Sequence, residues 1–180
     1  MRPDWFSRLP AHAPAGNLRR WLTEPDSLTA RCQRHCRQFR VRVVFQGRCR
    51  PLADEAVRAL LPVREVLLEC DGVPVIFAHS VLSTTRSGRL GRWFAQLGSR
   101  SLGSLLFTHP GFRRGPIEFL RIDRHHPLHR RVAALVGDAP AFWARRSRHV
   151  LGSGSVLVTE VFLPTIISLR HPVAVSAGGN

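Results

Sequence analysis

The sequence contains no lysine, so all 27 of its basic residues are arginines, and the formal net charge is +15. A charge of this size is typical of proteins that bind the phosphate backbone of nucleic acids. The arginines are scattered, however, and are dense only at residues 124–131 and 145–148, where no interleaved aromatic residues offer a stacking surface for bases. We therefore expect a chain-wide preference for arginine rather than a nucleic-acid site, and RNA binding is kept as an alternative.

Long hydrophobic runs are also missing, because no apolar stretch approaches the ~18 residues that a membrane-spanning helix needs. The first residues, Met1 to Trp5, lack the apolar region of a secretory signal. A length of 180 residues and a hydrophobic fraction of 44% suit one domain with its own core. We expect a soluble, cytoplasmic, monomeric protein without membrane insertion.

Motifs of several enzyme classes are absent as well. The sequence has no GxSxG for an activated serine, no P-loop and no dinucleotide-binding GxGxxG. Cysteine is scarce, and Cys32 and Cys36 neither have zinc-site spacing nor precede a second ligand pair. We expect Cys32, Cys36, Cys49 and Cys70 to be reduced thiols, and no metal site, because disulfides are rare in the cytoplasm.

The pattern of apolar residues predicts an α+β fold on a mostly antiparallel sheet, in one domain. Asp71 and Gly72 lie between two apolar runs, which is a strong hairpin signal. Helices are expected at residues 18–22, 28–36 (capped by Asp26 or Ser27), 53–61 and 91–97. Strands are expected at residues 39–45, 63–70, 75–82, 117–122, 142–150 and 156–163, with a turn at 46–47.

The expected domain covers residues 18–170, between a flexible lead-in at 1–17 and a disordered tail at 171–180. Within the domain, residues 123–141 resemble an insertion, since the stretch is charged and rich in histidine and then in Ala, Gly and Pro. Its histidines, His125, His126 and His129, are expected to be solvated.

Two predicted strands each carry one charge on an otherwise apolar face. Side chains alternate along a strand, so Arg64 shares a face with Val66, Leu68 and Cys70, while Glu65 and Glu69 lie opposite. By the same count Glu160 shares a face with Val156, Val158 and Phe162. An unpaired buried charge costs roughly several kcal/mol. Either Arg64 and Glu160 satisfy each other, or they line a pocket for a polar ligand.

The second alternative predicts a small closed pocket for an organic anion. The planar fork of Arg64 matches a carboxylate, and Glu160 can accept a hydroxyl hydrogen bond or a proton. The glycine-broken segment 101–107 allows a close backbone approach near Leu102. No metal or cofactor is required of such a site. His79 is either a pocket residue or a satisfied core histidine.

Five motifs of this chain resemble the chorismate pyruvate-lyase family. They are Trp-Leu-x-x-x-x-Ser-Leu-Thr at 21–29, Arg-Glu-Val-Leu-Leu-x-x-Asp-Gly at 64–72, Leu-Gly-Ser-Leu-Leu-Phe-Thr at 102–108, Trp-Ala-Arg-Arg-Ser-Arg at 143–148 and Leu-Val-Thr-Glu-Val-Phe-Leu-Pro at 157–164. The resemblance runs in order over residues 18–164, which is nearly the whole domain.

The resemblance implies a cofactor-independent lyase that converts chorismate to 4-hydroxybenzoate and pyruvate, the first step of ubiquinone biosynthesis. It also implies helical flaps over an enclosed pocket. Arg64 is expected to bind the ring carboxylate, Glu160 the ring hydroxyl, and the backbone at Leu28 and Leu102 the ligand. The family commonly has an arginine where this chain has His79, and if that arginine contacts the enolpyruvyl carboxylate, His79 must substitute for it.

A second class of function stays open, because the same fold serves as the effector domain of bacterial transcription regulators. Such a domain binds a small aromatic acid without turning it over. Residues 1–17 are too short for the DNA-binding domain that precedes it in those proteins, which favours the enzyme.

Overall fold

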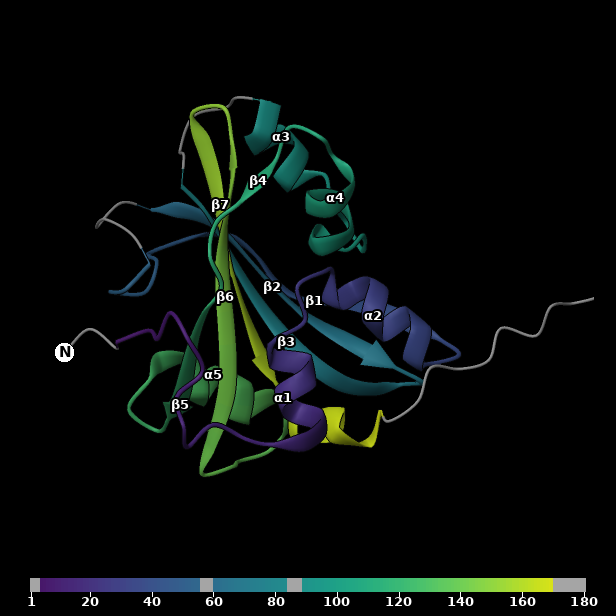
Figure 1. Ribbon diagram of the computed structural model, residues 1–180. Coiled ribbons are helices and arrows are strands. Elements are labelled where there is room, and N and C mark those ends of the chain that lie inside the picture. The colour runs from purple at the N-terminus through teal and green to yellow at the C-terminus, as the bar shows by residue number, and fades with distance from the viewer. Residues whose placement is uncertain (1–3, 56–59, 84–88, 170–180) are drawn as a thin grey trace, which may run out of the picture.

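The computed structural model describes residues 4–55, 60–83 and 89–169, and within them the chain forms one seven-stranded sheet with five α-helices around it (Figure 1). The strand order is β1-β2-β3-β7-β6-β4, and β5 also pairs with β6. All pairings are antiparallel, which confirms the predicted α+β fold. The strands are β1 Phe39–Cys49, β2 Leu61–Cys70, β3 Val73–Leu82, β4 Arg113–Arg114, β5 Glu118–Asp123, β6 Ala141–Leu151 and β7 Gly154–Phe162.

The helices cover both faces of the sheet. The face that carries Arg64 is called the front face here, and the face that carries His79 the back face. On the front face, one apolar cluster joins α1 and α2 to the sheet, and another joins α3 and α4, which lie toward the opposite end of the strands (Figure 1). On the back face, α5 packs on the sheet through Leu128 and Val132. The helices are α1 Gly16–Leu22, α2 Leu28–His35, α3 Arg89–Ala95, α4 Leu102–Thr108 and α5 Pro127–Val136, followed by the 3-10 helix η1 Pro164–Ser168.

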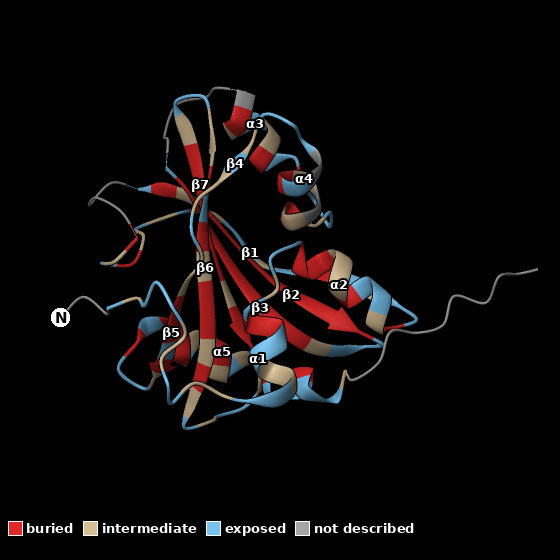
Figure 2. Ribbon diagram, in the orientation of Figure 1, coloured by how far each residue is buried: buried red, intermediate tan, exposed pale blue. Residues whose placement is uncertain are grey.

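Because helices lie on both faces, the central strands are buried along most of their length (Figure 2). Even Glu65 and Glu69, which face away from Arg64, are only 6% and 7% exposed. In the described part of the chain, no helix combines the length and the apolarity that crossing a bilayer requires.

Most of the predicted elements are confirmed. The β2–β3 hairpin turns at Asp71 and Gly72, which have positive φ angles of 51° and 81°, as the Asp-Gly signal predicts. Helix α2 begins after Ser27, whose side chain accepts a hydrogen bond from the Ala30 N–H, so Ser27 rather than Asp26 is the cap.

Two predicted elements are wrong. Residues 46–47 form no turn, because β1 continues to Cys49. The irregularity in this strand is a shift of its pairing register with β2 between Val43 and Phe45. Residues 53–55 form a turn rather than a helix, residues 56–59 lie outside the described part, and Leu61 already begins β2.

The stretch 123–141 is not the solvated segment that its charge suggests. His126 and His129 are 7% and 2% exposed, so their predicted solvation is wrong. His126 accepts a hydrogen bond from the Leu128 N–H and caps α5, which covers the back face of the sheet. That the stretch is an insertion stays a prediction.

The segment before α1 contacts the rest of the domain through residues near its start. Phe6 and Phe119 exchange two backbone hydrogen bonds of 2.8 Å, and the Trp5 indole donates to Asp54 at 2.7 Å. The predicted disordered tail at 171–180 lies outside the described residues.

Candidate active site

Arg64 projects from β2 into the front-face interior, as its strand phase predicts, and is 2% exposed. Its Nη2 donates to the carbonyls of Gly98 and Arg100, at 2.8 and 3.2 Å, in the segment between α3 and α4. Its Nε and Nη1 are buried and have no hydrogen-bond partner among the described residues. Burial lowers the pKa of the Arg64 guanidinium. A buried cation with two unsatisfied nitrogens is what a site for an anion provides before the anion binds.

Glu160 does not neutralise Arg64. Its carboxylate accepts from the Nε of Arg145 at 2.7 Å, and its side chain is 15% exposed. Arg145 is 1% exposed and also donates through Nη1 to the carbonyls of Leu22 and Glu24, just before α2. Of the two alternatives that the sequence left open, mutual pairing is therefore wrong.

The sheet register places Arg64 and Glu160 at two ends of one interval on the front face. Ser80 lies opposite Arg64 in β3, whereas Ala78 lies opposite Glu160. The two residues are thus two strands and two positions apart, which corresponds to a Cα separation of about 12 Å. Side chains between them are small or apolar and form a floor on which a flat ring can lie: Val66, Ala78, Ser80 and Val158.

Leu28 and Leu102 are the first residues of α2 and α4, and they are 2% and 8% exposed. The N–H groups at a helix start have no acceptor within the helix, so these two backbone positions can serve a ligand. The two helix starts touch, since Thr29 Oγ1 and Ser101 Oγ are 2.5 Å apart. A Cβ on Gly103 would lie 3.1 Å from Thr29 Oγ1, which confirms the predicted close approach of a glycine backbone in this segment.

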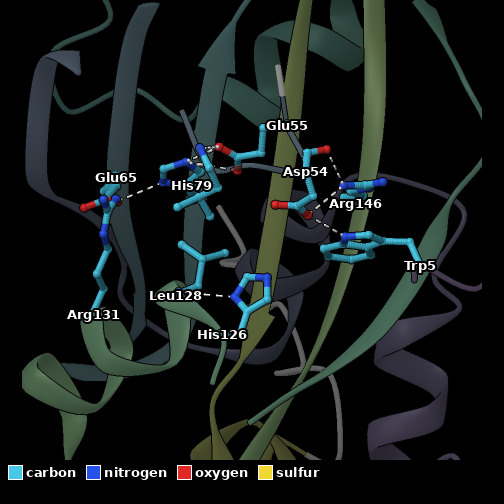
Figure 3. Close-up of polar contacts among 10 residues, drawn as sticks. Trp5, Asp54, Glu55, Glu65, His79, His126, Leu128, Arg131 and Arg146 are labelled. Atoms are coloured by element: carbon cyan, nitrogen blue, oxygen red, sulfur yellow. Dashed lines mark hydrogen bonds and ion pairs between the residues drawn. The ribbon is translucent and has the colours of Figure 1, made fainter. Parts of the chain in front are cut away.

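The structure does not bring His79 to this site. His79 points to the back face and is 1% exposed, between Glu65, 2.8 Å from Nδ1, and Glu55, 3.1 Å from Nε2 (Figure 3). Arg131 of α5 binds the same Glu65 carboxylate. Burial alone would lower the pKa of His79, but the hydrogen bonds to both carboxylates outweigh it and raise the pKa to about 9. His79 is therefore the satisfied core histidine of the two alternatives.

Sequence reasoning missed a group of polar residues beside Glu160. Arg114 of β4 donates from Nε to Ser147 Oγ at 3.1 Å and from Nη1 to the Pro25 carbonyl at 2.5 Å. Ser147 Oγ is also 3.2 Å from Nε2 of the buried His149. Burial, with Arg114 nearby, lowers the pKa of His149 to about 4, so this ring is neutral at pH 7.

A signal for this group was present in the sequence. The alternation along β6 puts Arg145, Ser147 and His149 on one face, but residues 145–148 read as a plain run of charge. The strand phase that identified Arg64 and Glu160 applies to this segment too.

The cysteines do not assemble a metal site in the described part of the chain, where no group of three or more His, Cys, Asp or Glu side chains is placed to hold an ion. Cys32, Cys36 and Cys70 are buried free thiols. Cys36 donates from Sγ to the Cys32 carbonyl at 3.0 Å, and burial raises its pKa to about 12.

Comparison with known proteins places the chain among relatives of one kind. Residues 4–171 match the family model described as chorismate lyase. A "probable chorismate pyruvate-lyase" from Dechloromonas aromatica (strain RCB) is 61% identical over 174 residues, which cover 94% of this chain and 99% of that protein. A protein of the same name from Nitrosomonas eutropha (strain DSM 101675 / C91 / Nm57) is 42% identical over 168 residues, covering 89% and 94%.

Among solved structures, the C-terminal domain of the histidine utilization repressor from Pseudomonas syringae pv. tomato str. DC3000 is similar. Its TM-score is 0.50 at 9% identity, and the match covers 71% of this chain and 93% of that one. At this identity the likeness concerns the fold alone.

Proposed function

The chain belongs to the chorismate lyase family, and we propose that its front-face site converts chorismate to 4-hydroxybenzoate and pyruvate. The relatives of 61% and 42% identity are named as probable chorismate pyruvate-lyases, which are carbon–oxygen lyases. The location of the site is supported by the buried Arg64, two of whose nitrogens have no partner among the described residues. Glu160 lies on the same face of the sheet, two strands and two positions away from Arg64.

Arg64 binds the ring carboxylate. Its Nε and Nη1 have no partner among the described residues, and their N–H groups point to different sides of the guanidinium, so the carboxylate accepts from one of these two nitrogens. The backbone N–H groups at Leu28 and Leu102 add hydrogen bonds at the same end, because the segment just before Leu102 is held by Arg64 itself. The carboxylate thereby replaces the water that the buried cation has lost.

Glu160 acts at the other end of the ring. Chorismate is a cyclohexadiene with a hydroxyl at C4 and an enolpyruvyl ether at C3. Glu160 accepts a hydrogen bond from the hydroxyl and takes the C4 proton as a general base. The C4–H electrons form the last ring double bond, and the C3–O bond breaks with its electron pair on the departing enolpyruvate. Protonation of the enolpyruvate methylene carbon gives pyruvate, and aromatisation supplies the driving force.

Arg145 holds the base in place. Its Nε bond to Glu160 and its bonds to the Leu22 and Glu24 carbonyls tie the carboxylate to the segment that leads into α2. A carboxylate fixed in this way is oriented before substrate arrives. Supply of 4-hydroxybenzoate to ubiquinone synthesis, action in the cytoplasm and a monomeric state stay part of the proposal.

The test is to incubate purified protein with chorismate and follow 4-hydroxybenzoate and pyruvate by chromatography. We expect equimolar release of both, with kcat lowered about 10²- to 10⁴-fold in Glu160→Gln. Glu118→Gln is the matched control. Glu118 pairs at 2.7 Å with Arg146, which lies in β6 next to Arg145, the partner of Glu160. Binding of 4-hydroxybenzoate without turnover of chorismate would instead indicate an effector-binding domain. Equal small losses in both variants would remove Glu160 from the mechanism.

A further inference from the structure

Chorismate carries a second carboxylate, and the proposed function says where it must lie. The enolpyruvyl group is attached at C3, next to the C4 hydroxyl. With the ring carboxylate on Arg64 and the hydroxyl on Glu160, the second carboxylate falls at the Glu160 end of the site. A cation is needed there, because moving an unpaired carboxylate out of water is energetically unfavourable.

The front face carries a charge that suits a dianion. Arg64, Arg114 and Arg145 are positive, Glu160 is negative, and His149 is neutral at pH 7. These side chains sum to two positive charges, with Asp26 and the Arg31-paired Glu24 near Arg114. The product 4-hydroxybenzoate, with one carboxylate, uses only the charge at Arg64.

Of the two arginines near Glu160, Arg145 is already committed. It is 1% exposed, its Nε binds Glu160, and its Nη1 serves two backbone carbonyls. Its charge is therefore paired with the general base, and two of its three nitrogens already have acceptors.

Arg114 is different, because its hydrogen-bond partners are neutral. They are the Ser147 hydroxyl and the Pro25 carbonyl, and no described carboxylate lies within ion-pair distance of Arg114. Its register partner in β6 is His149, two residues along the same face from Ser147. Burial, and after it the neighbouring Arg145, lower the pKa of Arg114, while Glu160, Asp26 and Glu24 raise it more weakly.

Resting on the proposed function, we propose that Arg114 binds the enolpyruvyl carboxylate and is the residue that distinguishes chorismate from 4-hydroxybenzoate. Its contacts to Ser147 and Pro25 fix the guanidinium between β6 and the segment before α2. A ligand therefore pairs with the Arg114 guanidinium only if it carries a second anionic group beside the hydroxyl.

The experiment compares two ligands on one variant. We expect Arg114→Met to raise KM for chorismate about 10- to 100-fold, the effect of one charged hydrogen bond. The Kd of 4-hydroxybenzoate, measured by titration calorimetry, is expected to stay within about threefold, because the product lacks the group that Arg114 binds. Arg114→Lys should recover part of the chorismate KM. The matched control is Arg113→Met, the exposed neighbour in β4.

Equal losses for chorismate and 4-hydroxybenzoate would overturn the proposal and make Arg114 a structural residue. No loss for either would overturn it as well. Should the variants not fold, the unmodified protein decides the question with 3-carboxymethoxy-4-hydroxybenzoate, which keeps both carboxylates. This compound must bind more tightly than 4-hydroxybenzoate, and equal or weaker binding contradicts a second carboxylate site. Failure of the wild type to turn over chorismate would refute the proposed function instead, which is a separate result.

Discussion

Replacing Arg64 with methionine should separate ligand binding from stability. The substitution removes the guanidinium and keeps most of the unbranched stem. It loses the two bonds to the Gly98 and Arg100 carbonyls, at about 1.5–3 kcal/mol each, but both residues are exposed and their carbonyls can turn to water. It also removes two unsatisfied nitrogens, which cost about 1–3 kcal/mol each.

Because these terms oppose one another, we expect the free energy of unfolding without ligand to change by less than about 2 kcal/mol. Breaking a satisfied buried ion pair would cost about 3–5 kcal/mol. With 4-hydroxybenzoate at 100 times its Kd, the wild type should gain about 2.7 kcal/mol and the variant nothing.

Urea unfolding followed by circular dichroism, with and without 4-hydroxybenzoate, measures both quantities. Arg121→Met, at an exposed position of β5, is the control and should keep the ligand effect. A variant that loses more than about 3 kcal/mol without ligand would show that Arg64 is structural. A variant that is still stabilised by 4-hydroxybenzoate would show that the ligand binds elsewhere.

Two further predictions concern other parts of the molecule. The pKa of His79 is raised from 6.5 to about 9, so its stabilising effect is complete below about pH 6.5 and is lost as the pH rises through 9. In urea unfolding from pH 6.5 to 10, His79→Gln should remove this loss and His125→Gln, at an exposed site, should keep it; parallel wild-type and His79→Gln curves would contradict the assignment. Thr29→Val removes the contact between α2 and Ser101, so release of 4-hydroxybenzoate should become about two- to tenfold faster in stopped-flow measurements. The control is Thr23→Val, at an exposed position, which should leave the release rate unchanged. An unchanged release rate in Thr29→Val would show that this contact does not hold the site closed.

Strand phase predicts the inward direction of Arg64 and the β2–β3 hairpin well, because both depend only on local alternation and on Asp71-Gly72. It predicts less about the back face. Alternation of apolar and charged residues is typical of a strand with one wet face, yet Glu65 is buried beneath α5 with His79 and Arg131 as partners. Only the tertiary structure shows that a second layer covers it.

Partners of the charged residues could not be predicted, since they come from distant parts of the chain. Glu160 is paired by Arg145 across a hairpin, and Arg145 in turn reaches carbonyls more than a hundred positions away. No helix is predicted for the glycine-broken segment 101–107, but Leu102 and Leu106 recur at helical spacing and are both buried, so packing outweighs the low helix propensity of Gly103 in α4.

A crystal structure of the protein with 4-hydroxybenzoate bound tests the proposed site most directly. We expect the carboxylate within hydrogen-bond distance of Arg64 Nε or Nη1, the two nitrogens that have no partner among the described residues. The phenol O–H should donate a hydrogen bond to the Glu160 carboxylate, over the floor of Ala78 and Val158. A ligand bound in the opposite direction, on the back face beside His79, or outside the front-face helices would contradict the assignment.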